Sequence, residues 1–198
     1  GQQYGGTITE CTSSAIVEGT NDVGGVVGQT NNGATLTACY ATGDVTAERD
    51  PRNNTYAGGV VGFNGGGTLT ACYATGNVTV TGDGTGSIYV GGVTGTNDEG
   101  TLTACYHANG TVSGPAGTTG GVAGRNYKFF NDPVITACYW GSNPDTGIGY
   151  NEGGSTTIET TKVTDGDWLD AVAQMNTALN ESGWQYELTG ALPTLKKQ

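Results

Sequence analysis

One recurring phrase constrains the fold of this chain more than any other feature. TLTACYATG stands at residues 35–43 and again at 68–76, and close variants stand at 101–110 and 134–141. A cysteine marks each copy: Cys39, Cys72, Cys105 and Cys138 are 33 residues apart, and Cys11 precedes Cys39 by 28. A fixed period in this range is typical of proteins built from stacked structural repeats.

Each repeat consists of short β-prone runs bounded by Gly, Asn or Asp, without helical periodicity. A Gly-Gly phrase opens the repeat, the cysteine phrase follows, and a Val/Thr phrase closes it. The Gly-Gly phrases are GGVVG at 24–28, GGVVG at 58–62, GGVTG at 91–95 and GGVAG at 120–124. Three short strands per repeat in constant phase predict a parallel β-helix, in which every rung stacks on the next. A propeller is the competing architecture, but its blades take about 40 residues or more.

A family resemblance supports this architecture. GGVVGFNGGGTLTACYATGNVTVTG at 58–82 resembles the GLUG-motif repeat, and related text covers about residues 1–141, four times over. The resemblance implies a right-handed parallel β-helix and an adhesive or scaffolding role in bacterial cell-surface or secreted proteins. Two departures are visible: Val replaces the Leu of the motif, and CTSSA at 11–15 replaces CYATG, which indicates a degenerate terminal rung. We therefore expect an all-β protein of about four to five rungs.

The cysteines are expected to be structural. Strand alternation with a bend near Ala71 places small and aliphatic side chains inside the coil, namely Leu69, Cys72, Ala74 and Val78. Rungs about 4.8 Å apart then stack one cysteine on the next. Buried inert thiols are one interpretation and a disulfide ladder is the other; parallel Cβ vectors and the odd count of five argue against the latter. Without a CxxC pair or a histidine partner, no metal site or cofactor is predicted.

A recurrent asparagine follows the Gly-Gly phrase as Asn64, Asn97 and Asn126, with Asn31 or Asn32 in the longer unit. An inward ladder of stacked amides would explain it. The tolerance of Asn for turn geometry explains it equally well.

Two outward features are candidate binding surfaces. If the cysteines face inward, a speculative ligand-binding strip of exposed aromatic rings follows, formed by Tyr40, Tyr73, Tyr106, Tyr139 and Trp140. Such rings suit a glycan or a partner protein, unless loops of the same rung cover them. Thr-x-Thr pairs flank the central Leu, as at 68–70, and resemble the flat face of ice-binding β-helices. Threonine is also a good strand residue on a solvated face.

The sequence contains few candidate catalytic residues. His107 is the single histidine, and we expect it in a surface bulge because YHANG replaces YATG. Acidic residues fall in separate loops, whereas a polysaccharide-active β-helix enzyme would need them clustered. The chain has a net charge of −11 and no basic patch in its sequence, which argues against nucleic acid as a partner. The sequence also contains no apolar run long enough to predict membrane insertion.

The repeat is expected to stop after Trp140, which gives three segments. Residues 1–141 form the β-helix, 142–164 a Gly/Thr-rich connector, and 165–198 a small α+β cap. In the cap, apolar residues from Trp168 to Leu179 recur with helical period, Asp165 or Asp167 is the expected N-cap, Gly183 the expected stop, and a hairpin follows. We expect this cap to cover the open edge of the last rung, and we expect further repeats or another domain before Gln2.

These patterns predict a non-catalytic adhesion or scaffold module at the bacterial cell surface or outside the cell. A host protein or a glycan is the expected partner class. The alternatives are a glycan-binding module that uses the tyrosines, an ice-binding face, and a polysaccharide-active enzyme.

Overall fold

The chain folds as a parallel β-helix with one helix and one hairpin at its C-terminal end. The structure is a computed structural model that describes residues 1–141 and 143–198. Strands of successive rungs pair in parallel and in strict register, as in the pairing of Leu36 with Leu69 and of Leu69 with Leu102. The parallel β-helix predicted from the sequence is therefore confirmed, whereas the count of three strands per rung is wrong.

A complete rung contains five short strands, such as β10 to β14. The Gly-Gly phrase separates two strands, and the cysteine phrase is split in two by its alanine. Ala38, Ala71, Ala104 and Ala137 all have left-handed φ, between 49° and 54°. This bend, which the sequence predicted at Ala71, lets Leu69 and Cys72 both face inward although they are three residues apart.

The strands stack as five columns. The first column holds β1 (Gln2–Tyr4), β6 (Val27–Asn31), β11 (Val61–Gly65), β16 (Thr94–Asp98), β21 (Ala123–Tyr127) and β23 (Ile148–Glu152). The second holds β2 (Thr7–Thr9), β7 (Thr35–Thr37), β12 (Thr68–Thr70), β17 (Thr101–Thr103) and the start of β22 (Val134–Trp140). The third holds β3 (Thr12–Ser13), β8 (Tyr40–Ala41), β13 (Tyr73–Ala74), β18 (Tyr106–His107) and the end of β22.

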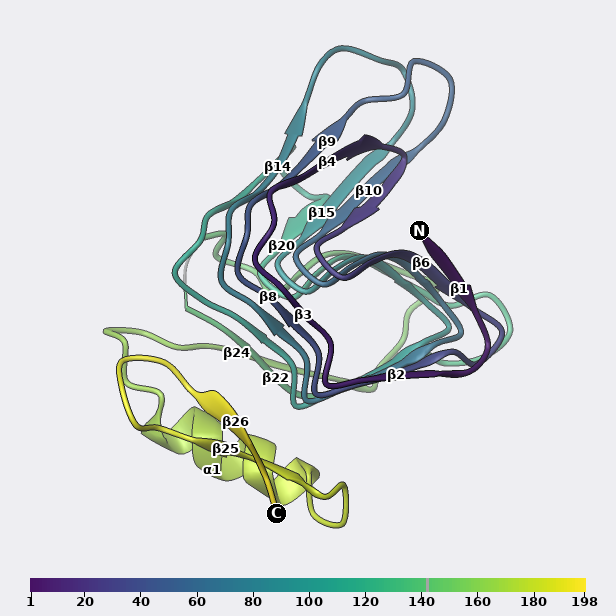
Figure 1. Cartoon of the computed structure of the whole chain (residues 1–198). Helices are drawn as coiled ribbons and strands as arrows, with labels where there is room; N and C mark the ends of the chain where they lie inside the picture. The colour runs from purple at the N-terminus through teal and green to yellow at the C-terminus, as the bar shows by residue number, and fades with distance from the viewer. Residues whose placement is uncertain (142) are drawn as a thin grey trace.

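The remaining two columns are shorter. The fourth holds β4 (Val17–Thr20), β9 (Val45–Glu48), β14 (Val78–Thr81) and β19 (Val112–Ser113). The fifth holds β5 (Asp22–Gly24), β10 (Thr55–Gly58), β15 (Ile88–Gly91) and β20 (Thr119–Gly120). Figure 1 shows that the fourth and fifth columns form an arm that rises from the wider body of the coil.

Two separate cores fill this cross-section. The body core contains the stacked leucines and cysteines, including Leu69 and Cys72, together with Ala74. The arm core contains Val78 and its neighbours Val45, Val90 and Val112. All four side chains that the sequence placed inside, Leu69, Cys72, Ala74 and Val78, are at most 1% exposed.

The Gly-Gly phrase forms the waist where the arm leaves the body. A Cβ atom on Gly59 would lie 2.3 Å from the carbonyl oxygen of Gly92 and 2.5 Å from the Cβ of Ala74. Such contacts are shorter than carbon atoms tolerate, so only glycine lets the two walls approach here. The recurrence of this phrase is therefore explained by packing.

The β-helix continues beyond Trp140, in the described part of the expected connector. β23 extends the first column by pairing with β21, and β24 (Ile158–Lys162) pairs with β22. The sequence did not reveal this because the two strands lack the cysteine phrase that defined the repeat.

The C-terminal segment contains helix α1 (Leu169–Ala178) and the antiparallel hairpin of β25 (Trp184–Glu187) and β26 (Thr194–Lys197). Helix and hairpin were both predicted. Trp168 occupies the N-cap position, and the backbone N–H of Leu169 donates to Asp167 Oδ1 over 3.1 Å. The expected stop at Gly183 is misplaced, because the helix ends at Ala178 with Leu179 as its C-cap, and Gly183, with φ of 79°, precedes β25.

The expected position of this cap is also wrong. Figure 1 shows α1 and the hairpin alongside the coil rather than over its end. Buried cap residues Trp168, Met175 and Tyr186 pack with Tyr73 and Tyr106, which belong to two successive rungs. At the far edge, Lys197 Nζ lies 3.0 Å from Glu10 Oε1. The cap therefore covers the outer side of the third column.

Candidate functional site

Three members of the predicted tyrosine strip, Tyr40, Tyr73 and Tyr106, form a stack; Tyr40 is half-buried and the other two are buried. The ring centroids of Tyr40 and Tyr73 are 4.6 Å apart and those of Tyr73 and Tyr106 are 4.7 Å apart, with both pairs 5° from parallel. Tyr106 is 0% exposed, while Tyr73 and Tyr139 are each 8% exposed. The expectation of an exposed strip is therefore wrong, and the covering element is the cap rather than loops of the same rung.

Hydrogen bonds secure the cap on this stack. The hydroxyl of Tyr106 donates to the carbonyl oxygen of Pro193 over 2.6 Å, and the hydroxyl of Tyr186 donates to that of Ala104 over 3.0 Å. The ring centroid of Trp168 lies 5.1 Å from that of Tyr106. Burial raises the pKa of the Tyr106 hydroxyl well above its ordinary value. These tyrosines hold the cap, and their faces are not available to a glycan.

Trp140, the fifth member of the predicted strip, points inward. It is 4% exposed, and a Cβ on Gly121 would lie 2.2 Å from its ring. Its Nε1 donates to the carbonyl oxygen of Pro144 over 2.8 Å. Trp140 is thus a waist residue, at the register position of Ala74 and His107 in the preceding rungs.

The asparagine ladder is present inside the coil. Asn64 Nδ2 donates to Asn97 Oδ1 over 2.8 Å, and Asn97 Nδ2 donates to Asn126 Oδ1 over 3.0 Å. All three side chains are 0% exposed. Thr30, and not Asn31 or Asn32, takes the position in the longer unit, where its hydroxyl donates to Asn64 Oδ1 over 2.6 Å. Every amide has a partner, so the ladder holds rungs together.

The cysteines form a ladder of free thiols. All five are unpaired, the four in register are buried, and Cys11 is exposed. Each buried thiol lies 3.4 Å from the carbonyl oxygen of the threonine two residues before it, as in Cys72 and Thr70. Burial raises the pKa of Cys72 and Cys105 well above the ordinary value. Buried inert thiols, rather than a disulfide ladder, describe the structure.

His107 lies in the waist, so its predicted place in a surface bulge is wrong. The side chain is 0% exposed and pairs in register with Ala74. Nε2 is 3.0 Å from the carbonyl oxygen of Gly76, so that nitrogen carries the proton and donates. Nδ1 is then an acceptor without a partner, and in the part of the chain described by the structure it is the one buried polar side-chain atom so placed. The extra residue of this rung is Asn109, whose φ is 66°.

The described residues assemble no group of metal ligands. Within residues 1–141 and 143–198, no three His, Cys, Asp or Glu side chains come together so as to hold a metal ion. The Thr-x-Thr pairs do align in register, as in Thr68 with Thr101 and Thr70 with Thr103. Ice binding by these columns stays a prediction that thermal hysteresis would test.

The loop between β21 and β22 presents an aromatic pair that the sequence analysis missed. Phe129 is 64% and Phe130 is 80% exposed, and their ring centroids are 4.3 Å apart at 70°. The Glu99 carboxylate accepts hydrogen bonds from the backbone N–H groups of Phe129, Phe130 and Asn131. The same bonds lower the pKa of Glu99, the largest effect being that of Phe130. We call residues 128–132 the Phe loop; consecutive phenylalanines in a chain with only three are the signal that could have identified it.

The nearby Arg125 is fully engaged. Its guanidinium carbon lies 4.8 Å from the ring centroid of Tyr89 and 4.7 Å from that of Tyr127. Nε donates to the Thr96 hydroxyl over 3.1 Å, and Nη1 donates to Glu152 Oε2 over 3.2 Å. Its charge is thus matched within the protein, and it is not an anion site.

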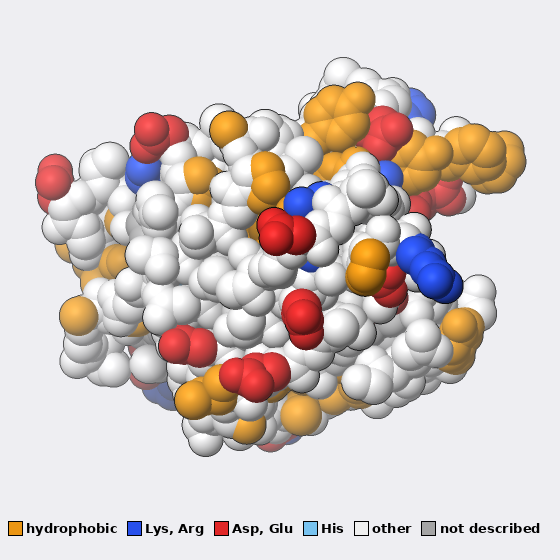
Figure 2. Space-filling view, turned by 90° about the horizontal axis from the view of Figure 1, so that it is seen from above, with side chains coloured by type: hydrophobic (Ala, Val, Ile, Leu, Met, Phe, Trp, Pro, Cys, Tyr) orange, Lys and Arg blue, Asp and Glu red, His pale blue; other side chains and the backbone are white. Residues whose placement is uncertain are grey.

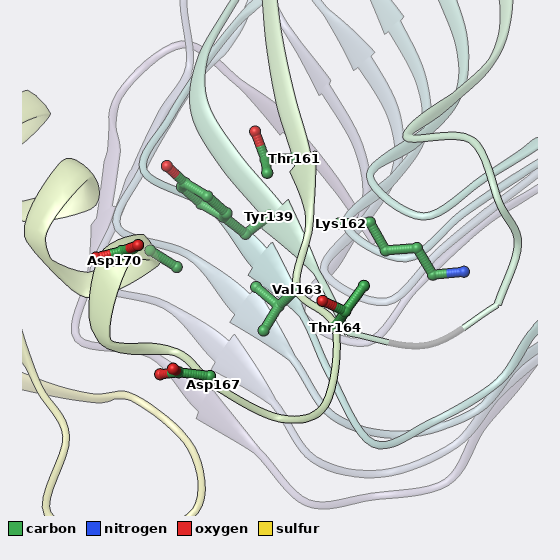
Figure 3. Close-up of a pocket in the computed structure, with 8 residues that line it drawn as sticks. Tyr139, Thr161, Lys162, Val163, Thr164, Asp167 and Asp170 are labelled. Carbon is green, nitrogen blue, oxygen red and sulfur yellow. The ribbon is translucent and has the colours of Figure 1, made fainter.

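A cavity of about 270 Å³ lies between the cap and the last strands. Figure 3 shows Tyr139 from β22, Thr161 and Lys162 from β24, and Asp167 and Asp170 from the start of the cap around it. Val163, Thr164 and Ala171 complete the lining. Polar side chains from β22, β24 and the start of the cap thus converge around this cavity.

One comparison with known protein families found a match. A family model described as the GLUG motif matches residues 19–46 and 53–81. Each match spans most of one rung, from the end of the arm to the following Val/Thr strand. No curated protein and no solved structure matches the chain. Of the residues that the structure describes, none form a helix long and apolar enough to cross a membrane.

Proposed function

Because the chain carries GLUG-motif repeats folded as a β-helix, we propose that it is a non-catalytic adhesion or scaffold module of a bacterial surface or secreted protein. The observation that carries this proposal is the Phe loop, which holds two exposed aromatic rings in a fixed position. A host protein or a glycan is the partner class. The surface or extracellular location rests on the resemblance to GLUG-motif proteins, which occur there.

The β-helix is suited to a scaffold. Parallel pairing runs through six strands in the first column, and ladders of asparagine, leucine and cysteine repeat the same contacts from rung to rung. In such a stack each rung is held by its neighbours. A loop on this stack keeps its position relative to the coil.

The Phe loop is organised before any partner arrives. Besides the three backbone bonds to Glu99, Asn131 Nδ2 donates to Glu99 Oε2 over 3.1 Å, and Lys128 pairs with Asp132 at 2.8 Å. Binding therefore requires little further ordering of the loop, and ordering is a main cost of association. Aromatic side chains, phenylalanine included, are also enriched at protein interfaces.

The surface around such anchors is mostly polar. Figure 2 shows hydrophobic side chains gathered at one end of the visible face, with acidic side chains beside them and across the rest of that face. With a net charge of −11, we expect a partner whose contact surface is neutral or basic.

The test replaces both rings. Purified full chain and the Phe129→Ser/Phe130→Ser double variant are compared on arrays of extracellular-matrix proteins and of glycans. Burying a phenylalanine contributes about 1.5–3 kcal/mol, so the double variant should bind a retained partner at least about 100-fold more weakly.

Leu169→Ser is the matched control, because Leu169 is also 64% exposed but lies on α1. It should bind like the unmodified chain. Equal binding by the double variant, or release of reducing ends from any polysaccharide on the array, would contradict the proposal.

A further inference from the structure

The cavity beside α1 is lined by a tyrosine, Tyr139, whose ring is mostly buried. Tyr139 is 8% exposed, and among the described residues the ring stack of its counterparts ends at Tyr106. No hydrogen bond of its hydroxyl exists among the described residues. Figure 3 shows the hydroxyl end of Tyr139 extending towards the helix that carries Asp170. The hydroxyl can therefore exchange hydrogen bonds with a ligand in the cavity.

The lining is negative and its charge is not matched inside the cavity. Asp167 and Asp170 stand at the exposed rim, and one Asp167 oxygen accepts from the N–H of Leu169, which leaves the other free. The cation of the lining, Lys162, is bound to Asp145 at 2.8 Å, and Figure 3 shows it extending away from Tyr139. Burial raises the pKa of the Tyr139 hydroxyl, and negative charge at Glu159 and Asp170 adds to this effect.

We propose that this cavity, between Tyr139 on the coil and Asp170 on α1, is a binding site for a primary ammonium group. An ammonium carries three N–H donors and a positive charge. The cavity offers matching acceptors in the carboxylates of Asp167 and Asp170 and in the hydroxyls of Tyr139, Thr161 and Thr164. The Tyr139 ring adds a cation–π contact. A divalent metal ion is a poorer fit, since the described residues contain no group of three acidic ligands.

Two sources share this chemistry: a lysine side chain of a partner protein and an amino sugar. The volume of about 270 Å³ admits either an aliphatic stem or one sugar ring. The site deepens the proposed adhesive function by naming a ligand group. It uses no residue of the Phe loop, so failure here leaves the test of the Phe loop intact.

The experiment titrates the full chain with methyl β-glucosaminide and with Nα-acetyl-lysine amide, followed by amide chemical shifts in NMR spectra. N-acetylated forms of both compounds are the matched ligands without charge. We expect shifts at Thr161, Val163 and Asp170 with millimolar dissociation constants for at least one amine, and none for the acetylated forms. Binding of only one amine identifies the source.

Variants distinguish binding in this cavity from non-specific attraction of the amine to the negatively charged protein. Asp170→Asn should weaken amine binding at least tenfold, and Tyr139→Phe should weaken it severalfold, because each removes one acceptor. Glu181→Gln removes the same charge elsewhere in the cap and should change nothing. Thermal unfolding midpoints within about 2 °C of the original would show that the cap is intact. Equal shifts with acetylated ligands, no shifts at all, or equal weakening by Glu181→Gln would overturn the proposal.

Discussion

At the residue scale, equivalent positions in successive rungs have the same structural role. Cys72 faces the body core in contact with the backbone of its own and the preceding rung, with its thiol 3.6 Å from the Leu36 carbonyl oxygen. The next residue, Tyr73, faces the cap. Alternation across the strand thus separates a thiol that fills space from a ring that holds the cap.

The thiols give a simple prediction. A thiol reagent added to native protein should modify Cys11, which is exposed, and should leave the four buried thiols untouched. Reactivity requires an accessible thiolate, and burial disfavours it. Absorbance with a disulfide-forming reagent should report one thiol per chain in buffer and five in denaturant. Cys11→Ser should remove the native signal; rapid modification of more than one thiol would contradict the buried ladder.

His107 predicts a pH dependence of stability. Burial lowers its pKa in the folded chain, only partly offset by the bond to Gly76. At pH above about 6.5 the ring is neutral in both states, and no stability depends on it. As the pH falls below that value, the unfolded chain binds a proton that the folded chain resists, so the free energy of unfolding should decrease by up to about 1.4 kcal/mol per pH unit.

Urea unfolding at pH 7.5, 6.5 and 5.5 would measure this effect. His107→Ala introduces the residue that the preceding rungs carry as Ala41 and Ala74, and it should reduce the slope. An identical slope in both proteins would show that other groups cause the pH dependence.

At the scale of elements, the sequence predicted the strands that belong to the repeated phrases and missed the strands outside them. The recurrent Leu, Cys and Val positions identified the inward faces because identical rungs bury identical side chains. The bend at Ala71 followed from the spacing of Leu69 and Cys72. β23 and β24 were missed because pairing with a neighbouring rung requires only free backbone groups, not the cysteine phrase.

The sequence could not decide, for a physical reason, whether the recurrent asparagines form a buried ladder or occupy turns. Asparagine satisfies a turn and a buried ladder equally well, and only the register of neighbouring rungs decides between them. The waist position of His107 was missed because the insertion in YHANG is not located by sequence. The actual bulge at Asn109 shows that His107 keeps the register of Ala74.

Asn97 predicts the cost of breaking the ladder. Asn97→Ala removes its donations to Gly100 and Asn126 and leaves Asn64 without its partner across the rung. One hydrogen bond contributes about 1 kcal/mol, and a buried polar group left unpaired costs about 1–3 kcal/mol, so we expect a loss of about 2–4 kcal/mol in chemical denaturation. Asn180→Ala, at an exposed position outside the ladder, should cost less than about 1 kcal/mol. Similar losses for both variants would count against the ladder.

At the scale of the whole molecule, the cap and the coil are one structure. The cap was predicted as an end cover because the last rung presents open strands. It lies instead on the third column, since that side carries the apolar stack of Tyr40, Tyr73 and Tyr106. Helix periodicity showed that α1 has an apolar face but could not show which face of the coil it covers.

Tyr186→Phe tests how the cap is held. The change removes the hydroxyl that donates to the Ala104 carbonyl oxygen and leaves this buried acceptor unpaired. We expect a loss of about 1–3 kcal/mol and faster amide hydrogen exchange in α1 than in β12 or β17. Tyr150→Phe is the control, because Tyr150 is 47% exposed on β23. Equal acceleration of exchange in α1 and in strands β12 and β17 would show that the Tyr186 hydroxyl does not hold the cap specifically.

The stacking of rungs in register is the central claim, and methyl nuclear Overhauser effects measure it most directly. Leu36, Leu69, Leu102 and Ile135 pair in that order along the second column. Neighbouring rungs are about 4.8 Å apart and alternate rungs about 9.6 Å apart. With methyl-labelled protein, we predict strong cross-peaks between successive members of this series and none between Leu36 and Leu102. Cross-peaks that skip a rung, or their absence between Leu69 and Leu102, would contradict the parallel β-helix described here.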